Sequence, residues 1–216
     1  MSHHLLPSPL PSAFCALLPL LSLAACSTVD EKGGTEVHLH MADEAPPALL
    51  TEATLSPASL ELIECAVATS PIDWIIPSAR AHHPTTSSTG LHLDAPVDRM
   101  IPGAELGAIS PPAGDYCALR VVIEPLGAAG TSLTVAQGGD AAASGTSAGS
   151  AWLDLSLSPQ LTLDEDHLSA ELHVSAALSA WPAALARAGA QGLTDPDAVG
   201  DAVLAEIKGQ ITASAE

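Results

Sequence analysis

The sequence is short of aromatic and basic residues. It contains one phenylalanine, one tyrosine and three tryptophans, and it has no asparagine. The chain has 216 residues, long enough for one sizeable domain, and 47% of them are hydrophobic. Its core must therefore be built from leucine, valine, isoleucine and alanine. Six Lys and Arg stand against 25 Asp and Glu, and the net charge of −19 argues against nucleic acid as a partner.

Several common haem-binding and metal-binding motifs are also absent. No C-x-x-C-H motif occurs, so we expect no covalently attached haem, and neither H-E-x-x-H nor C-x-x-C is present. Residues 145–149, GTSAG, match the pattern of a hydrolase nucleophile elbow around Ser147. The match lies among Ala/Ser/Gly repeats, without a strong strand before it or a helix after it. We therefore interpret residues 136–150 as a low-complexity mobile loop and expect a protein that is not an enzyme.

The N-terminus is typical of an export signal. Residues 13–23 form an apolar run that is too short to span a bilayer. The run ends in Leu-Ala-Ala-Cys26, which resembles the bacterial lipobox, whose cysteine is acylated and becomes the mature N-terminus. We expect residues 1–25 to be a lipoprotein signal peptide, although the first twelve residues lack Lys and Arg. Cys26 would then anchor the protein in the cell envelope, with the outer membrane favoured, and residues 26–35 would form a tether. An ordinary cleaved signal or a buried helix is the alternative.

Removal of the signal leaves two further cysteines, Cys65 and Cys117. An even pair in an oxidising compartment predicts a disulfide. Such a bond would close a loop of about 50 residues and contribute ~4 kcal/mol in the chain-entropy model. Two buried free thiols are the alternative.

Hydrophobic and polar residues alternate with a period of two along much of the chain, which predicts half-buried strands. In residues 115–124 the alternation predicts that Cys117 and Leu119 face the core and that Tyr116 lies on the polar face. Trp152 falls on the polar side of its segment, where it is either exposed or covered by the C-terminal helix. The other alternating segments are 36–41, 57–67 (with a bulge between Leu62 and Ile63), 151–157 and 167–176.

The C-terminal segment has the period of a helix. Asp195 is a suitable N-cap, and Pro196 suits the first helical position. An apolar stripe follows, made by Val199, Val203, Leu204, Ile207 and Ile211. Strands followed by one or two helices predict a mostly β fold. We expect an antiparallel β-sandwich of immunoglobulin- or transthyretin-like topology over residues 36–180 and a helical appendage over residues 181–216.

Histidines are the candidate ligands for a metal ion. His38 and His40 are two apart on a predicted strand, so their side chains project from one face, about 7 Å apart. The other candidates flank a Pro/Ser/Thr-rich loop that could fold over this face, and they are His82, His83 and His92. Three or four nitrogen ligands would suit copper or zinc. The alternative is a solvated surface whose histidines have no metal role.

Other side chains are weaker candidates for ligands. Met100 could add a thioether if the ion were copper, and Asp94 lies close to His92. His167 and His173 lie six residues apart on one strand, about 20 Å, so they cannot share one ion. Acidic residues at 164–166 and at the start of the C-terminal helix lack the pattern of a calcium loop.

Three stretches carry a resemblance to a known family. They are EVHLHM…TLSPASLELIEC, LHLDAPVDRMIPGAELGAI and PPAGDYCALRVVIEP. Over residues 35–176 the chain resembles secreted bacterial β-sandwich lipoproteins, whose characterised members include MbnP-like periplasmic proteins. These proteins bind copper and act with di-haem peroxidase-like enzymes. The resemblance implies a bound copper ion and a periplasmic redox partner. Its motifs are strands and turns of the fold, so they do not identify the residues that coordinate copper.

We therefore expect a lipid-anchored extracytoplasmic binding protein that holds copper through surface histidines. The alternative is a structural or protein-interaction module of the cell envelope with no metal role.

Overall fold

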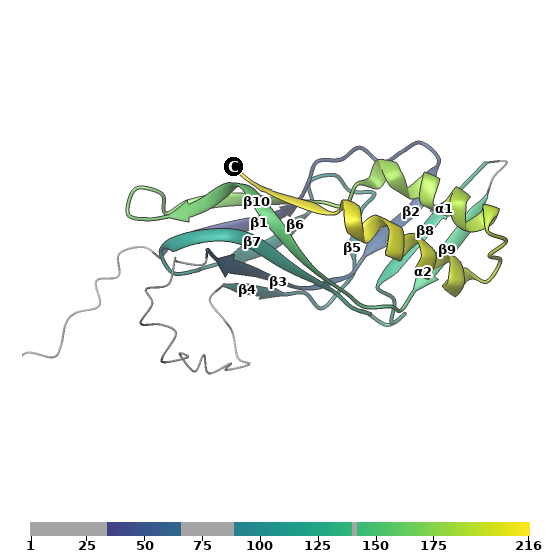
Figure 1. Cartoon of the computed structure of the whole chain (residues 1–216), viewed down its shortest axis with the longest axis horizontal. Helices are drawn as coiled ribbons and strands as arrows, with labels where there is room; N and C mark the ends of the chain where they lie inside the picture. The colour runs from purple at the N-terminus through teal and green to yellow at the C-terminus, as the bar shows by residue number, and fades with distance from the viewer. Residues whose placement is uncertain (1–33, 66–88, 140–141) are drawn as a thin grey trace, which may run out of the picture. The chain divides into compact units, whose positions relative to one another are not determined.

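The larger of two β-sheets contains eight strands (Figure 1). The structure is a computed structural model and describes residues 34–65, 89–139 and 142–216. Most neighbouring strands in this sheet are antiparallel, but two pairs are parallel: the fourth with the fifth strand and the sixth with the seventh strand of the following order. The order across the sheet is β4 (Gly90–His92), β3 (Pro57–Glu64), β7 (Gly114–Ile123), β10 (Ala151–Leu163), β12 (Thr212–Ala215), β11 (Ser169–Ser175), β1 (Glu36–Met41) and β6 (Glu105–Ile109).

The two parallel pairs, named by their labels, are β1 with β11 and β10 with β12. Each member of such a pair reaches its partner through a long stretch of chain, as parallel strands require. Strands β10 and β11 follow each other in the chain but do not pair, because β12 lies between them.

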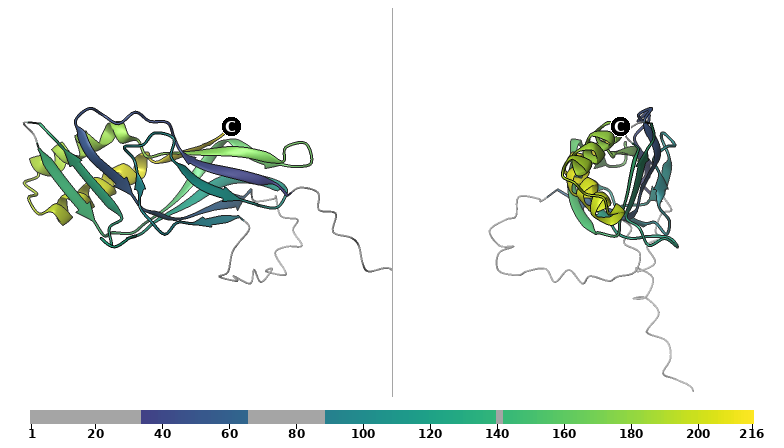
Figure 2. Two further views of the ribbon diagram at one scale, coloured as in Figure 1. Left: turned by 180° about the vertical axis from the view of Figure 1, so that it is seen from behind. Right: turned by 90° about the vertical axis from the view of Figure 1, so that its right-hand side faces the viewer.

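The smaller sheet has four strands and is covered by two helices (Figure 2). Helices α1 (Trp181–Ala190) and α2 (Pro196–Ile207) pack against each other and against the edge strand of this sheet. Short 3₁₀ turns, η1 (Leu178–Ala180) and η2 (Lys208–Gln210), precede α1 and follow α2. The strand order of the smaller sheet is β5 (Val97–Asp98), β2 (Leu50–Leu55), β8 (Leu133–Gln137) and β9 (Ala143–Ser147).

The larger sheet curls until its two edge strands, β4 and β6, come into contact. Gly107 on β6 has a φ of +142°, and a Cβ there would lie 3.1 Å from the Cδ2 atom of Leu91 on β4. Glycine in a strand often marks such a close approach. The sheet is therefore nearly barrel-shaped, with its hydrophobic side turned inward.

Both sheets and both helices contribute to one hydrophobic core. As the composition predicts, the core is mostly Leu, Val, Ile and Ala, and Trp181 and Tyr116 are the fully buried aromatic side chains among the described residues. The indole Nε1 of Trp181 donates a hydrogen bond to the carbonyl oxygen of Ala176 at 2.9 Å. This bond allows a polar indole to be buried where α1 begins.

The prediction of a mostly β fold with one or two C-terminal helices is confirmed: the structure has 48% strand and 18% helix, with two helices near the C-terminus. Helix α2 begins at Pro196, and Val199, Val203, Leu204 and Ile207 are buried as predicted. Ile211 is buried too, but beyond the end of α2. The expectation of antiparallel strand pairing holds for most pairs but is wrong for β1 with β11 and β10 with β12.

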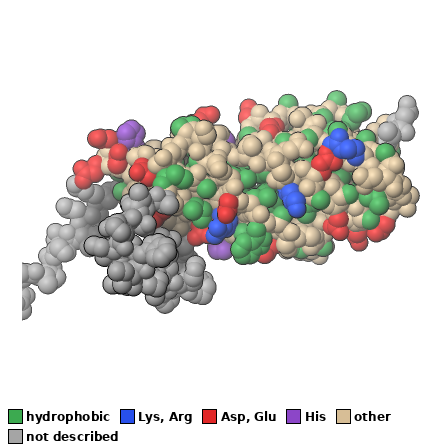
Figure 3. Space-filling model, viewed as in Figure 1, with side chains coloured by type: hydrophobic (Ala, Val, Ile, Leu, Met, Phe, Trp, Pro, Cys, Tyr) green, Lys and Arg blue, Asp and Glu red, His purple; other side chains and the backbone are tan. Residues whose placement is uncertain are grey.

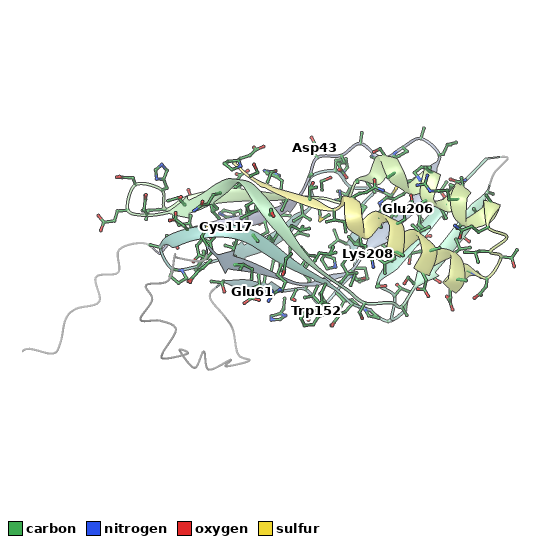
Figure 4. The ribbon with its side chains drawn as sticks, in the orientation of Figure 1. Asp43, Glu61, Cys117, Trp152, Glu206 and Lys208 are labelled. Carbon is green, nitrogen blue, oxygen red and sulfur yellow. A yellow bond between two sulfur atoms is a disulfide. The ribbon has the colours of Figure 1, made fainter. Side chains whose placement is uncertain are left out.

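The predicted orientation of Tyr116 and Cys117 is wrong. Tyr116 is fully buried and donates a hydrogen bond from its hydroxyl to the carbonyl oxygen of Pro112, whereas Cys117 is exposed. The pairing of β7 with both neighbouring strands shifts between Tyr116 and Ala118, so the alternation slips by one residue at Cys117. The predicted disulfide is present: the Cys65 and Cys117 sulfurs are bonded, with Cα atoms 4.8 Å apart (Figure 4).

The prediction of a mobile loop over residues 136–150 is also wrong for residues 136–137 and 143–147, which lie in strands. β8 and β9 form an antiparallel hairpin there. Helix α2 packs closely on β9, because Gly145 and Gly200 have no side chains to keep the backbones apart. Thr146 and Ser147 donate hydrogen bonds to Asp197 and Asp201 of α2, at 2.8 and 2.6 Å.

Candidate functional site

Three histidine side chains form a row on the polar face of β1 and β11. His38 and His40 alternate along β1 with buried Val37, Leu39 and Met41, so their side chains share the opposite, polar face. The parallel pairing of β1 with β11 places His173 directly opposite His40. The ring centroids lie 6.5 Å apart for His38 and His40 and 5.7 Å apart for His40 and His173. We call these three residues the histidine row.

Carboxylates flank both ends of the histidine row. The Nε2 atom of His38 lies 3.7 Å from a carboxylate oxygen of Glu36. The Nε2 atom of His173 lies 3.7 Å from Glu171 and 3.8 Å from Glu216. These separations are too long for hydrogen bonds, and Nε2 of His173 is buried without a hydrogen-bond partner in the described part of the chain.

The surface of the molecule is mainly acidic, which favours cations in general. On the face of the molecule shown in Figure 3, Lys and Arg side chains are few and isolated, while Asp and Glu side chains are common. This distribution agrees with a chain whose net charge is −19. An acidic surface raises the local concentration of cations in general and does not by itself select one metal.

The remaining predicted ligands do not join the histidine row. His92 is exposed on β4, and neither a ring contact nor an ion pair links it to His38 or His40 in the described structure. Met100 packs against the hydrophobic core. His82, His83 and the lipidation residue Cys26 lie outside the described residues.

In the described ranges, no three His, Cys, Asp or Glu side chains converge as a metal site would require. The rings of the histidine row are stacked, with interplanar angles of 27° and 25°, so their nitrogens do not point at one position. Binding of one ion by two or three of these rings would require side-chain rotation. Both common χ1 rotamers are accessible to residues in strands.

Sequence reasoning missed His173 because it considered this residue only with His167. Those two histidines are indeed separate, since His167 lies in the turn before β11, where its Nδ1 atom is 2.9 Å from Asp164. The hydrogen bond from His167 and the backbone amide of Asp166 lower the pKa of the Asp164 carboxyl. The partner of His173 is His40, which is distant in the sequence and adjacent only through strand pairing. The signal that the sequence did offer was that both predicted strands carry histidine on their polar face.

Ser147 does not form the nucleophile elbow whose sequence pattern it matches. It is fully buried at the end of β9, where its hydroxyl donates to Asp201 and accepts a hydrogen bond from the Gly149 amide at 2.9 Å. An elbow serine instead needs an exposed hydroxyl on a strand-to-helix turn. The role visible here is to join β9 to α2.

No helix among the described residues is long and apolar enough to cross a membrane. No protein-family model, curated protein or solved structure matches the chain.

Proposed function

We propose that this protein is a lipid-anchored protein of the cell envelope that binds a copper ion through the histidine row. The observation that carries the proposal is the position of His40 between His38 and His173 on one polar face. Imidazole nitrogen suits copper, and a given set of nitrogen ligands binds Cu²⁺ more tightly than the other divalent ions of the first transition row.

The donor set fits such an ion in three respects. The three imidazoles belong to neighbouring, paired strands, so their backbone positions are fixed while their rings can rotate. Coordination would also give Nε2 of His173 the partner that it lacks. Glu36 and Glu171 lie within 4 Å of the outer rings, where their charge would favour a bound cation.

The disulfide and the lipobox support the proposed location. A bonded Cys65–Cys117 pair is typical of proteins outside the cytoplasm, and the Leu-Ala-Ala-Cys26 sequence follows an apolar run of suitable length. We further propose a redox protein of the same compartment as the partner, as the family resemblance implies. An immunoglobulin- or transthyretin-like relationship of the two sheets also stays a proposal, supported by the two-sheet architecture.

Titration of the purified full-length protein with Cu²⁺ in detergent tests the copper proposal. We expect one ion per chain, bound more tightly than micromolar, and an electron paramagnetic resonance spectrum with nitrogen hyperfine coupling. Replacement of the central ligand, His40→Gln, should weaken binding by about tenfold or more. Binding should also weaken on acidification, because imidazole must be neutral to coordinate a metal.

His167→Gln is the matched control, since His167 is exposed and lies in a turn away from the histidine row. Copper affinity unchanged by both His40→Gln and His173→Gln would refute the assignment. A His82→Gln/His83→Gln double variant reports separately on the two predicted ligands outside the described residues. If the unaltered protein binds no copper, the structural or interaction module becomes the better description.

A further inference from the structure

Trp152 is the most exposed large hydrophobic side chain of the described residues, with 71% of its surface accessible. It lies on β10 and projects outward from the larger sheet, at the position labelled in Figure 4. The neighbouring Ala151 is buried, as strand alternation requires. Trp152 is therefore held at a fixed position on a regular strand, not on a loose loop.

Strand register places three further outward side chains in line with Trp152. Val122 on β7 is directly opposite Trp152, Ser59 on β3 is opposite Val122, and His92 on β4 is opposite Ser59. With strands spaced about 4.8 Å apart, this line extends ~14 Å from Trp152 to His92. That length is comparable to a short linear oligosaccharide.

A second line, two residues along each strand, is polar. Arg120 on β7 lies opposite both Asp154 on β10 and Glu61 on β3. Its Nε and Nη2 atoms donate to the two carboxylate oxygens of Asp154 at 2.8 and 3.2 Å, and its Nη1 atom lies 3.9 Å from Glu61. These contacts fix the orientation of the Arg120 guanidinium and the Asp154 carboxylate. The carboxylates of Asp154 and Glu61 both retain lone pairs that can accept further hydrogen bonds.

We propose that Trp152 and this polar line bind a neutral oligosaccharide of equatorially substituted pyranose rings. Such a ring presents weakly positive C–H groups on one face, which stack on the electron-rich face of an indole, and hydroxyl groups at its edge. Trp152 supplies the platform, and Asp154 and Glu61 accept hydrogen bonds from the hydroxyls. Their negative charge disfavours acidic glycans.

Other occupants fit this surface less well. A protein hot spot needs a well-packed apolar centre, but Trp152 is bordered by Val122, which is only 9% exposed, and by polar side chains. Insertion into a membrane would bring Asp154 and Glu61 against lipid, at a high desolvation cost. An isolated aromatic platform beside oriented carboxylates is the arrangement that a sugar ring matches.

Calorimetric titration of the full-length protein with cellotetraose and with tetra-N-acetylchitotetraose tests the proposal. We expect saturable binding of at least one of them, weakened about tenfold or more by Trp152→Ala, as for other ligands that stack on aromatic side chains. Asp154→Asn and Glu61→Gln should each weaken binding by a smaller factor. The control Ile101→Ala removes another exposed hydrophobic side chain, 56% accessible, and should change nothing.

Absence of binding to both sugars at millimolar concentration would overturn the proposal, as would binding that Trp152→Ala leaves unchanged. Self-association that Trp152→Ala abolishes, measured by analytical ultracentrifugation, would also overturn it, because the occupant would then be a second copy. Circular dichroism of each variant confirms folding. His40→Gln should not affect sugar binding, so this proposal and the copper proposal fail independently.

Discussion

Gly200→Ala is expected to destabilise the protein, although replacing glycine by alanine inside a helix normally stabilises it by ~1 kcal/mol. A Cβ atom at residue 200 of α2 would lie 2.0 Å from the carbonyl oxygen of Thr146, 2.1 Å from its carbonyl carbon and 2.7 Å from its amide nitrogen. All three are backbone atoms of β9, so they cannot rotate aside as the end of a side chain could. Helix α2 would have to move away from the strand.

The loss in free energy of unfolding can be estimated from the packing and the hydrogen bonds that this movement of α2 disturbs. Overpacking of this kind costs about 1–3 kcal/mol. Moving α2 also stretches the hydrogen bonds from Thr146 to Asp197 and from Ser147 to Asp201, each contributing ~1 kcal/mol. After subtraction of the ~1 kcal/mol gained in helix propensity, we expect the free energy of unfolding to fall by about 2–4 kcal/mol.

Gly189→Ala is the matched control for this prediction. Gly189 also lies within a helix, α1, but no heavy atom would lie within 4 Å of an added Cβ. This variant should be more stable by about 0.5–1 kcal/mol. Urea unfolding followed by circular dichroism measures both changes, and equal stabilisation by the two substitutions would refute the close packing of α2 on β9.

Three further predictions concern stability. Reducing the Cys65–Cys117 disulfide, which spans 52 residues, should lower the free energy of unfolding by about 4 kcal/mol; unfolding with and without reductant measures this, and a loss below ~1 kcal/mol would contradict it. Burial and the charge of Glu64 raise the pKa of Tyr116 above 10.0. The folded state therefore holds this proton more tightly than the unfolded state, and this contribution to stability is complete below pH 10.0 and is lost as the pH rises through the folded-state pKa. Absorbance titration of the single tyrosine measures the shift, and an unshifted transition would disprove it. Glu44→Gln should cost about 3 kcal/mol because it leaves the fully buried Arg99, 3.5 Å away, without its main counter-charge. Arg99→Met should cost less, since Glu44 is partly exposed to water; thermal unfolding compares the two, and the reverse order would exclude this explanation.

Regular alternation made several strands predictable from the sequence. β1 and β11 have long, uninterrupted patterns of buried and exposed residues, and so does the part of β10 that had been predicted. The C-terminal helix was predictable from Pro196 and the apolar stripe after it. In each case a local pattern and burial in the folded protein favour the same structure.

β9 and β12 could not be predicted in this way. Their sequences, ASGTS and TASA, have small side chains with little preference for a strand. They become strands because β8 pairs with β9, and because β10 and β11 pair with β12. Only the tertiary structure supplies these partners.

Only part of the histidine row could be predicted from the sequence, because the rest depends on which strands pair. The two-residue spacing of His38 and His40 fixes their shared face in any strand. The addition of His173 depends on which strands pair, in which direction and in which register. A single sequence contains no direct signal for those three choices.

The position of β12 has a consequence for the order of assembly. This strand pairs with both β10 and β11, which do not pair with each other. The two parts of the larger sheet therefore cannot join until residues 212–215 have taken their place between them. A chain that emerges from a ribosome or an export channel with its N-terminus first can form hairpins early but can complete this sheet only after residues 212–215 have emerged. Removal of residues 212–216 should therefore leave two unpaired strand edges within the sheet, a condition that favours aggregation during folding.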